Sequence, residues 1–355
     1  MRTLDDSKNY SIDREEMYYK IIHLPDNIRS AYFTPVIHIP ERLNLINNKF
    51  AITKKIERVI IVGMGGSAIS GDIFKTAYSH HIPVEVYKDY CIPAISKHDL
   101  LIICSYSGNT EEALSSMEQG YDKAAFIVGI TSNGILKKRL NGKHIWVELP
   151  GGYPPRAAIG LLFFSLLQIV EKFGVIPRRE GDVRSTISSL MLKAGAVAGN
   201  VMTEFNITKQ AAESIINKIP VIYASNPSLA PIAYRWKCQI NENAKYPAFY
   251  HILPEMNHNE IEAWENKQFR KVFIPIFLSH IEEEFSYRKR LKFLRDLFSR
   301  ENITYLDYYS EGSSYLERAF TLIYLGDMIS YYLAITQGVD PTTIDYINKL
   351  KEAIS

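Results

Sequence analysis

The chain has few cysteines, no excess of charge of either sign and no long uninterrupted apolar run. Its three cysteines, an odd number without CxxC spacing, argue against a disulfide framework and a structural zinc site, and they favour a cytoplasmic location. Lys and Arg number 41 against 39 Asp and Glu, without blocks of like charge, so we expect no nucleic-acid partner. The N-terminus lacks an apolar signal segment, and the longest apolar helix candidate, 157–170, is too short to span a bilayer, so we expect no membrane association.

What the sequence does have is the length for two domains and two similar halves. A chain of 355 residues exceeds the size at which one core usually stops growing. From about residue 57, short apolar runs alternate with helical stretches, and a second series of the same order begins near residue 219. This alternation predicts two α/β domains, each a doubly wound, flavodoxin-like parallel sheet flanked by helices. We predict an N-terminal arm on the first domain (1–50), the first domain (51–175), a linker and connecting helix (176–200), and the second domain with a C-terminal helix (201–355).

A glycine-rich turn follows the first strong strand pattern. The run RVIIVG leads into Met64-Gly65-Gly66-Ser67-Ala68, and a helical pattern follows. Glycines at such a turn let backbone N–H groups approach an anion at a helix N-terminus. The same residues also fit the GxGxxA dinucleotide pattern, with Asp89 about 20 residues further on, or they serve only a tight turn. The turn alone leaves these alternatives open.

A second loop of hydroxyl residues follows the apolar run LLIIC. Ser105, Ser107 and Thr110 precede the helical pattern EEALSSMEQ. Thr110 also fits the ordinary role of a helix N-cap ahead of two glutamates, but capping does not account for the two serines. Hydroxyls over a helix N-terminus make a neutral phosphate cradle, so we predict phosphate binding here. Because loops after parallel strands meet at one sheet edge, we expect both loops to contribute.

Six motifs in order carry a resemblance to a known family. They are GMGGSAISGD, SYSGNTEE, GGYPPRAA, WKCQINENAK, PEMNHNEI and GVDPTTIDYINKLK. Over about residues 55–355 the chain resembles the bifunctional phosphoglucose/phosphomannose isomerases of archaea and bacteria, which are built from two sugar-isomerase (SIS) domains. The resemblance implies interconversion of glucose 6-phosphate and mannose 6-phosphate with fructose 6-phosphate by proton transfer through a cis-enediolate. It implies no cofactor, and no spacing of metal ligands supports a zinc-dependent route.

The resemblance also assigns roles to individual residues. Glu242 corresponds to the base, with Cys238 and Ile240 as small departures beside it. Arg156 would stabilise the enediolate, although it could instead pair with an acid at the start of the following helix. His258 would open the sugar ring from the neighbouring subunit, which implies a homodimer with a composite active site. Lys351 would assist, with Lys349 as the competing choice. The phosphate of the sugar 6-phosphate would contact the two loops through Gly66, Ser67, Ser105, Ser107 and Thr110.

Other functions predict features that this sequence does not show. A sugar-phosphate sensor built on SIS domains would carry a basic helix-turn-helix near the N-terminus, whereas residues 1–50 contain several prolines and charges of both signs. A dehydrogenase would bind nicotinamide, and an amidotransferase would need a glutaminase domain, which is not visible. We therefore expect an isomerase, with the sensor as the alternative.

Overall fold

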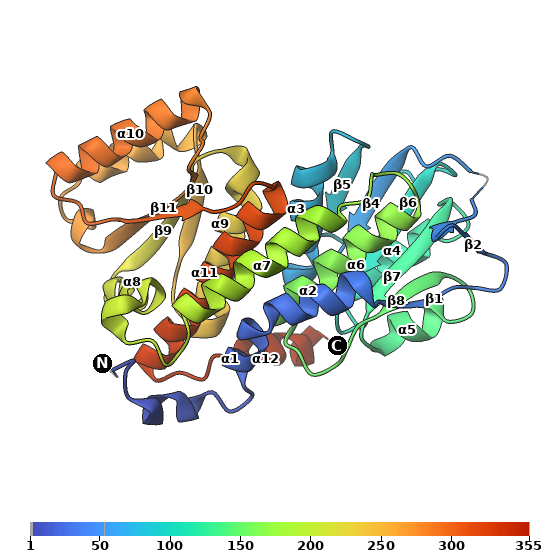
Figure 1. Ribbon diagram of the computed structural model, residues 1–355, viewed down its shortest axis with the longest axis horizontal. Coiled ribbons are helices and arrows are strands. Elements are labelled where there is room, and N and C mark those ends of the chain that lie inside the picture. The colour runs from blue at the N-terminus through green and yellow to red at the C-terminus, as the bar shows by residue number, and fades with distance from the viewer. Residues whose placement is uncertain (1–2, 53, 355) are drawn as a thin grey trace. The chain divides into compact units, whose positions relative to one another are not determined.

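The computed structural model describes residues 3–52 and 54–354. The chain divides into two compact units. The first unit contains His23–Ile187, and the second contains Ser188–Ser355 together with the N-terminal segment up to Ile22 (Figure 1). The helix α7 (Glu180–Ala196) carries the chain from the first unit into the second.

The first unit is built on a six-stranded sheet in the order β1-β8-β7-β6-β4-β5. Five of the strands are parallel, and β1 pairs antiparallel with β8 at one edge. When the five parallel strands are numbered in sequence order, starting with β4 as strand 1, their spatial order from the β5 edge is 2-1-3-4-5, which confirms the predicted flavodoxin-like fold. The strands are β1 (Val36–His38), β4 (Arg58–Val62), β5 (Val84–Tyr87), β6 (Asp99–Cys104), β7 (Phe126–Thr131) and β8 (Ile145–Glu148), and a separate hairpin joins β2 (Leu45–Ile46) to β3 (Lys49–Phe50).

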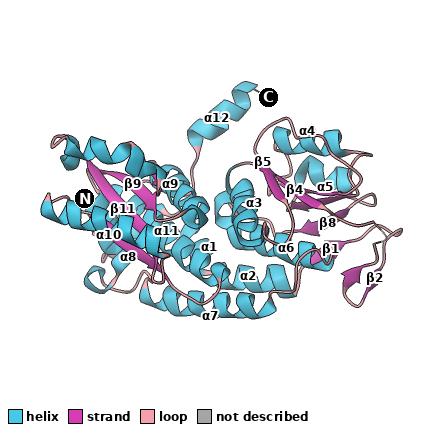
Figure 2. Ribbon diagram, turned by 90° about the horizontal axis from the view of Figure 1, so that it is seen from above, coloured by secondary structure: helices cyan, strands magenta, loops and turns pink. Residues whose placement is uncertain are grey.

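Helices cover both faces of this sheet (Figure 2). On one face, α4 (Glu111–Gly120) and α5 (Gly134–Leu140) pack against Ile60 and Val62 of β4. On the other face lie α3 (Gly65–Tyr78), α6 (Ile159–Lys172) and α2 (Leu24–Phe33); Gly71 of α3 lies so close to Ile61 that a Cβ atom there would be 2.9 Å from it. Because both faces are covered, all six residues of β6 are buried, which explains the continuous apolar run in the sequence.

The second unit repeats this plan with four strands in the order β10-β9-β11-β12, all parallel. The strands are β9 (Ile219–Ala224), β10 (Phe249–Ile252), β11 (Phe273–His280) and β12 (Leu306–Ser310). The helices are α8 (Ile207–Ile215), α9 (Ala230–Ala244), α10 (Phe285–Arg300), α11 (Tyr315–Gln337) and α12 (Asp345–Ile354), and the short 3-10 turns are η3 (Thr203–Phe205), η4 (Pro227–Leu229), η5 (Glu255–His258), η6 (Glu260–Glu265) and η7 (Phe269–Lys271).

The N-terminal segment differs from the sequence prediction. The predicted arm over 1–50 is divided between the units: its later part lies in the first unit, whereas η1 (Ser7–Ile12) and α1 (Met17–Ile22) belong to the second. Among the contacts that hold it there is a fully buried ammonium group, because Lys209 donates hydrogen bonds to the carbonyls of Leu4 and Gly199, each at 2.9 Å. A buried charge needs such partners, and the N-terminal backbone provides one of them.

The longest apolar helix is also not the predicted one. Residues 157–170 fall largely in α6, which is buried as expected. Among the described residues, however, α11 is the one helix long and apolar enough to cross a bilayer, with 23 residues and a mean hydropathy of 1.3 in its apolar window. All of that window is buried inside the protein, where α11 packs against α8 and α9. We therefore interpret α11 as the core helix of the second unit.

Candidate active site

The candidate site of the first unit lies where the strand order reverses, between β4 and β6. Because α3 follows β4 on one face and α4 follows β6 on the other, the two connecting loops diverge at the carboxyl edge of the sheet, which is where sheets of this topology are expected to form a ligand crevice. The glycine loop (63–66) and the hydroxyl loop (105–110) both start there. They are close neighbours, since a Cβ atom on Gly63 would lie 2.8 Å from the carbonyl oxygen of Cys104.

The glycine loop places backbone N–H groups at the start of α3. Gly65 adopts φ +50°, a conformation that favours glycine, and Met64 occupies the N-cap position without a side-chain capping bond. The first N–H groups of an α-helix have no partner within the helix. Ser67 is buried in this first turn. The turn is therefore free of a side-chain cap where an anion would bind.

The hydroxyl loop is ordered by bonds among its own members. Ser105 is buried, and its Oγ lies 3.0 Å from Oγ1 of Thr110 and accepts a hydrogen bond from the Gly108 N–H at 3.2 Å. Ser107 is exposed, and its Oγ accepts from the Asn109 N–H at 3.4 Å. Thr110 does occupy the N-cap position of α4, but its side chain makes no capping bond. The capping interpretation therefore fails for the Thr110 hydroxyl, and α4 also begins without a side-chain cap.

Arg156 lies beside the glycine loop. It belongs to the short turn η2 (Pro155–Ala158), directly before α6, and it is only 3% exposed. A Cβ atom on Gly66 would lie 3.0 Å from the Pro155 carbonyl oxygen and 3.1 Å from the Arg156 Cα atom. A Cβ atom at this position would push the two backbones apart by a few tenths of an ångström, so glycine permits the close approach of the glycine loop to the turn that carries Arg156.

Tyr106 is a site residue that the sequence reasoning missed. Its hydroxyl donates a hydrogen bond to the Pro150 carbonyl at 2.6 Å and accepts one from the Tyr153 N–H at 3.0 Å. The hydroxyl loop is therefore fastened to the segment that leads into the Arg156 turn. A tyrosine between two serines in a loop was the available signal, since a buried phenol needs a polar partner.

The predicted base Glu242 and the predicted ring-opening residue His258 belong to the second unit. Glu242 is half-buried in the last turn of α9, which ends at Ala244 before Lys245 in the left-handed conformation. Its neighbour Asn243 is buried and donates to Ser330 of α11 at 2.9 Å, which fixes this turn of α9. His258 ends the turn η5 and is exposed.

The two candidate lysines both lie on α12 and are exposed. Lys349 Nζ lies 5.7 Å from the centre of the Tyr346 ring, a cation–π contact within its own helix. Both lysines are exposed, so exposure does not distinguish them.

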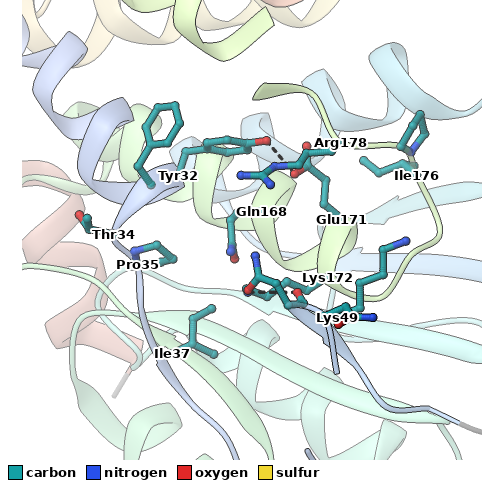
Figure 3. A pocket seen from close by; sticks show the side chains of 14 residues that line it. Tyr32, Thr34, Pro35, Ile37, Lys49, Gln168, Glu171, Lys172, Ile176 and Arg178 are labelled. Carbon is teal, nitrogen blue, oxygen red and sulfur yellow. Dashed lines mark hydrogen bonds between the residues drawn. The ribbon is translucent and has the colours of Figure 1, made fainter. Parts of the chain in front are cut away.

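A pocket of about 390 Å³ in the first unit lies away from these loops (Figure 3). Gln168, Glu171 and Lys172, from the C-terminal end of α6, line it, whereas the Arg156 turn precedes the N-terminal end of the same helix. Fourteen residues of α-helix span about 21 Å, so the pocket and the Arg156 turn are separate places. Glu171 accepts a hydrogen bond from the Tyr32 hydroxyl at 2.8 Å, and burial raises the pKa of its carboxyl.

Among residues 3–52 and 54–354, no group of three or more His, Cys, Asp or Glu side chains is arranged to hold a metal ion.

Comparisons with known proteins agree with this architecture. The family profile of the bacterial phospho-glucose isomerase C-terminal SIS domain matches residues 204–354. The bifunctional phosphoglucose/phosphomannose isomerase of Caldicellulosiruptor bescii is 35% identical over 345 residues, covering 96% of this chain and 99% of that protein. The same-named protein of Aquifex aeolicus is 34% identical, covering 83% and 90%.

Solved structures show the same fold at low sequence identity. A glucose-6-phosphate isomerase like protein from Thermus thermophilus superposes with a TM-score of 0.66 at 16% identity, covering 97% of this chain and 99% of that one. Together, the parallel SIS-type sheets, the two loops at the switch point and the full-length similarity to the C. bescii protein show that this chain belongs to the bifunctional phosphoglucose/phosphomannose isomerase family.

Proposed function

We propose that the protein is a cytoplasmic isomerase that interconverts glucose 6-phosphate and mannose 6-phosphate with fructose 6-phosphate by proton transfer without a metal. The observation that carries this proposal lies at the carboxyl edge between β4 and β6. Two helices begin there without side-chain caps, the Ser105–Thr110 hydroxyl pair stands at the start of α4, and the glycine loop adjoins the Arg156 turn. The names of the full-length relatives give the substrate class.

The substrate phosphate binds to the two loops. Phosphate oxygens accept hydrogen bonds from the backbone N–H groups that begin α3 and α4, and the helix dipoles favour the negative charge. Ser67, Ser105, Ser107 and Thr110 add hydroxyl donors, and the N–H of Gly66 contributes because no side chain covers it. The Ser105 and Thr110 hydroxyls bond to each other at 3.0 Å in the free protein, and each can rotate to donate to the phosphate.

Proton transfer needs a base, and Glu242 is the base in this proposal. Its carboxylate removes a proton from C1 or C2 and returns it to the neighbouring carbon. One carboxylate serves both aldoses if the intermediate rotates about C2–C3, so that C2 is protonated on either face.

The enediolate needs a fixed positive charge, which Arg156 provides. A guanidinium stays charged at any relevant pH, and at 3% exposure its field is weakly screened by water. His258 opens the sugar ring, since imidazole can both accept and donate a proton near pH 7. We propose that His258 comes from the partner subunit of a homodimer and that Lys351 assists it.

The test measures turnover of both aldose 6-phosphates with the Ser105→Ala/Ser107→Ala double variant. Each hydrogen bond to a charged group contributes about 1.5–3 kcal/mol, so losing two should raise KM by roughly 10²- to 10⁴-fold for both substrates, with kcat reduced less. The matched control is Ser79→Ala, whose hydroxyl bonds only within the opposite end of α3. An unchanged KM for the double variant refutes the phosphate assignment, and binding without turnover by the wild type favours the sensor.

A further inference from the structure

The carboxyl edge of the second sheet is built like that of the first. In the second sheet β9 lies between β10 and β11 and is parallel to both. In the first sheet β4 lies between β5 and β6 and is parallel to both. Helix α10 packs on the face of β9 that contains Tyr223, and Trp236 of α9 contacts Tyr308 of β12 on the opposite face. A crevice is therefore expected between the ends of β9 and β11. On topology alone, the chain should offer two anion sites.

A carboxylate of the protein itself occupies this second crevice. Glu283, in the loop after β11, is 6% exposed. Its Oε2 accepts hydrogen bonds from Ser225 Oγ at 2.5 Å and from the His280 backbone N–H at 3.1 Å, while its Oε1 accepts from Asn226 Nδ2 at 2.6 Å. Ser225 and Asn226 directly follow β9, so they stand where the glycine loop follows β4 in the first unit.

The groups that hold Glu283 are neutral hydrogen-bond donors. Within the described ranges we find no ion pair between Glu283 and a Lys or Arg side chain. Burial lowers the pKa of the neighbouring His280; the Glu283 carboxylate opposes this shift and Arg318 adds to it, and the net lowering favours the uncharged imidazole. A buried carboxylate without a cation is costly unless donors satisfy its oxygens. A hydroxyl, an amide N–H and a backbone N–H around one anion are the kinds of donor that recognise an oxyanion.

Local structure does not require Glu283 in this position. The N-cap of α10 is the next residue, Glu284, whose own carboxylate accepts from the Ser286 N–H at 3.4 Å. The turn after β9 is closed by the Asn226 amide oxygen, which accepts from the Ser228 N–H at 2.8 Å. The Asn226 amide nitrogen therefore remains available to hold an anion.

The first unit differs at the same place. Among its described residues, no carboxylate forms a hydrogen bond with Ser67, Ser105 or Thr110. We propose that the crevice formed by Ser225, Asn226 and the His280 N–H is an oxyanion cradle whose resident anion is the Glu283 carboxylate. The second unit is thereby closed to a sugar phosphate, and the chain binds one substrate phosphate. This last step rests on the proposed function, whereas the cradle itself does not.

The cradle is tested by removing its anion from the full-length protein. Glu283→Ala should lower the midpoint of thermal unfolding, because three donors lose their acceptor. Formate, which has the size of the missing carboxylate, should raise that midpoint in a concentration-dependent way, and the wild type should respond much less because its cradle is filled. Inorganic phosphate should act in the same direction if the cradle admits a tetrahedral anion. A variant that responds to formate no more than the wild type overturns the proposal.

Glu283→Gln is the matched control, since its amide fills the space but replaces one of the two accepting oxygens with an N–H₂ donor, which faces at least one of the three donors. It should be destabilised without formate rescue, and rescue equal to that of the alanine variant overturns the proposal.

If neither variant folds, calorimetric titration of the wild type with fructose 6-phosphate decides. One equivalent per chain supports the inference, and two overturn it. Loss of that equivalent in Ser105→Ala/Ser107→Ala assigns it to the first unit. If the double variant still binds one equivalent, the assignment of the phosphate to the two loops is refuted, and the proposal for Glu283 is judged by the formate experiment alone.

Discussion

The contact between the glycine loop and the Arg156 turn predicts that Gly66→Ala impairs catalysis without weakening the fold. The new Cβ atom would lie 3.0 Å from the Pro155 carbonyl oxygen and 3.1 Å from the Arg156 Cα atom. Both are backbone atoms, so no side-chain rotation can relieve the contact, and the turn must shift by a few tenths of an ångström. Since a misplacement of 1 Å can cost about 10²-fold, we expect kcat/KM to fall by about 3- to 10-fold for both aldose phosphates.

The thermal unfolding midpoint separates this effect from a loss of stability. Gly66 lies in the first turn of α3, where alanine is favoured over glycine by up to about 1 kcal/mol, so the midpoint should hold or rise. The matched control is Gly151→Ala in the segment before Arg156, because a Cβ atom there would meet nothing within 4 Å. Wild-type kcat/KM in Gly66→Ala, or an equal loss in Gly151→Ala, would refute the argument that this close approach positions Arg156.

Three further predictions concern the base, the dimer and the acid stability of the first unit. Glu242→Gln should lower kcat by roughly 10²–10⁴-fold in parallel for both aldose phosphates with little change in KM, and retention of one activity in steady-state assays would require a second base. Mixing Glu242→Gln with His258→Ala should restore activity through hybrid dimers; no recovery after proven subunit exchange counts against a shared site. Burial alone would raise the pKa of Asp99, but hydrogen bonds from Arg58 and the Ser96 N–H outweigh it and lower this pKa. A lowered pKa stabilises the fold at pH values above the unfolded value of about 3.9, and this stabilisation is lost as the pH falls through the folded value. In Asp99→Asn the urea midpoint of unfolding should therefore fall less steeply with decreasing pH than in the wild type. An unchanged slope would contradict the assignment.

The fold could be predicted because its signals are local. The central strands β4, β6 and β7 are short apolar runs that are almost entirely buried, and helical patterns separate β4 from β5, β6 from β7, and β7 from β8, so a parallel α/β sheet follows from the alternation. The N-terminal segment could not be predicted in this way. Its place in the second unit depends on Lys209, a lysine about 200 positions away whose burial leaves no trace in the local pattern.

The candidate site could be predicted only in part, since sequence reasoning identifies residue types but not which hydrogen bonds they make. Thr110 is at the N-cap position, as predicted, yet its hydroxyl bonds to Ser105 and not to the helix. Tyr106 was overlooked because its role is to join two loops that are about 45 residues apart. Both cases depend on which side chains and backbone groups meet in the folded loops, and local sequence patterns do not carry that information.

The two units show why a repeated fold does not imply a repeated site. Each sheet opens a crevice between neighbouring parallel strands, so topology supplies the place twice. Chemistry then separates the two crevices. In the described part of the first unit no carboxylate accepts from Ser67, Ser105 or Thr110, whereas Ser225 and Asn226 after β9 already donate to Glu283. Because the carboxylate is part of the chain, its effective concentration at the donors is high, and an anion from solution must bind much more tightly to displace it. The carboxylate that separates the two crevices, Glu283, is therefore recognised from its contacts and not from a sequence motif.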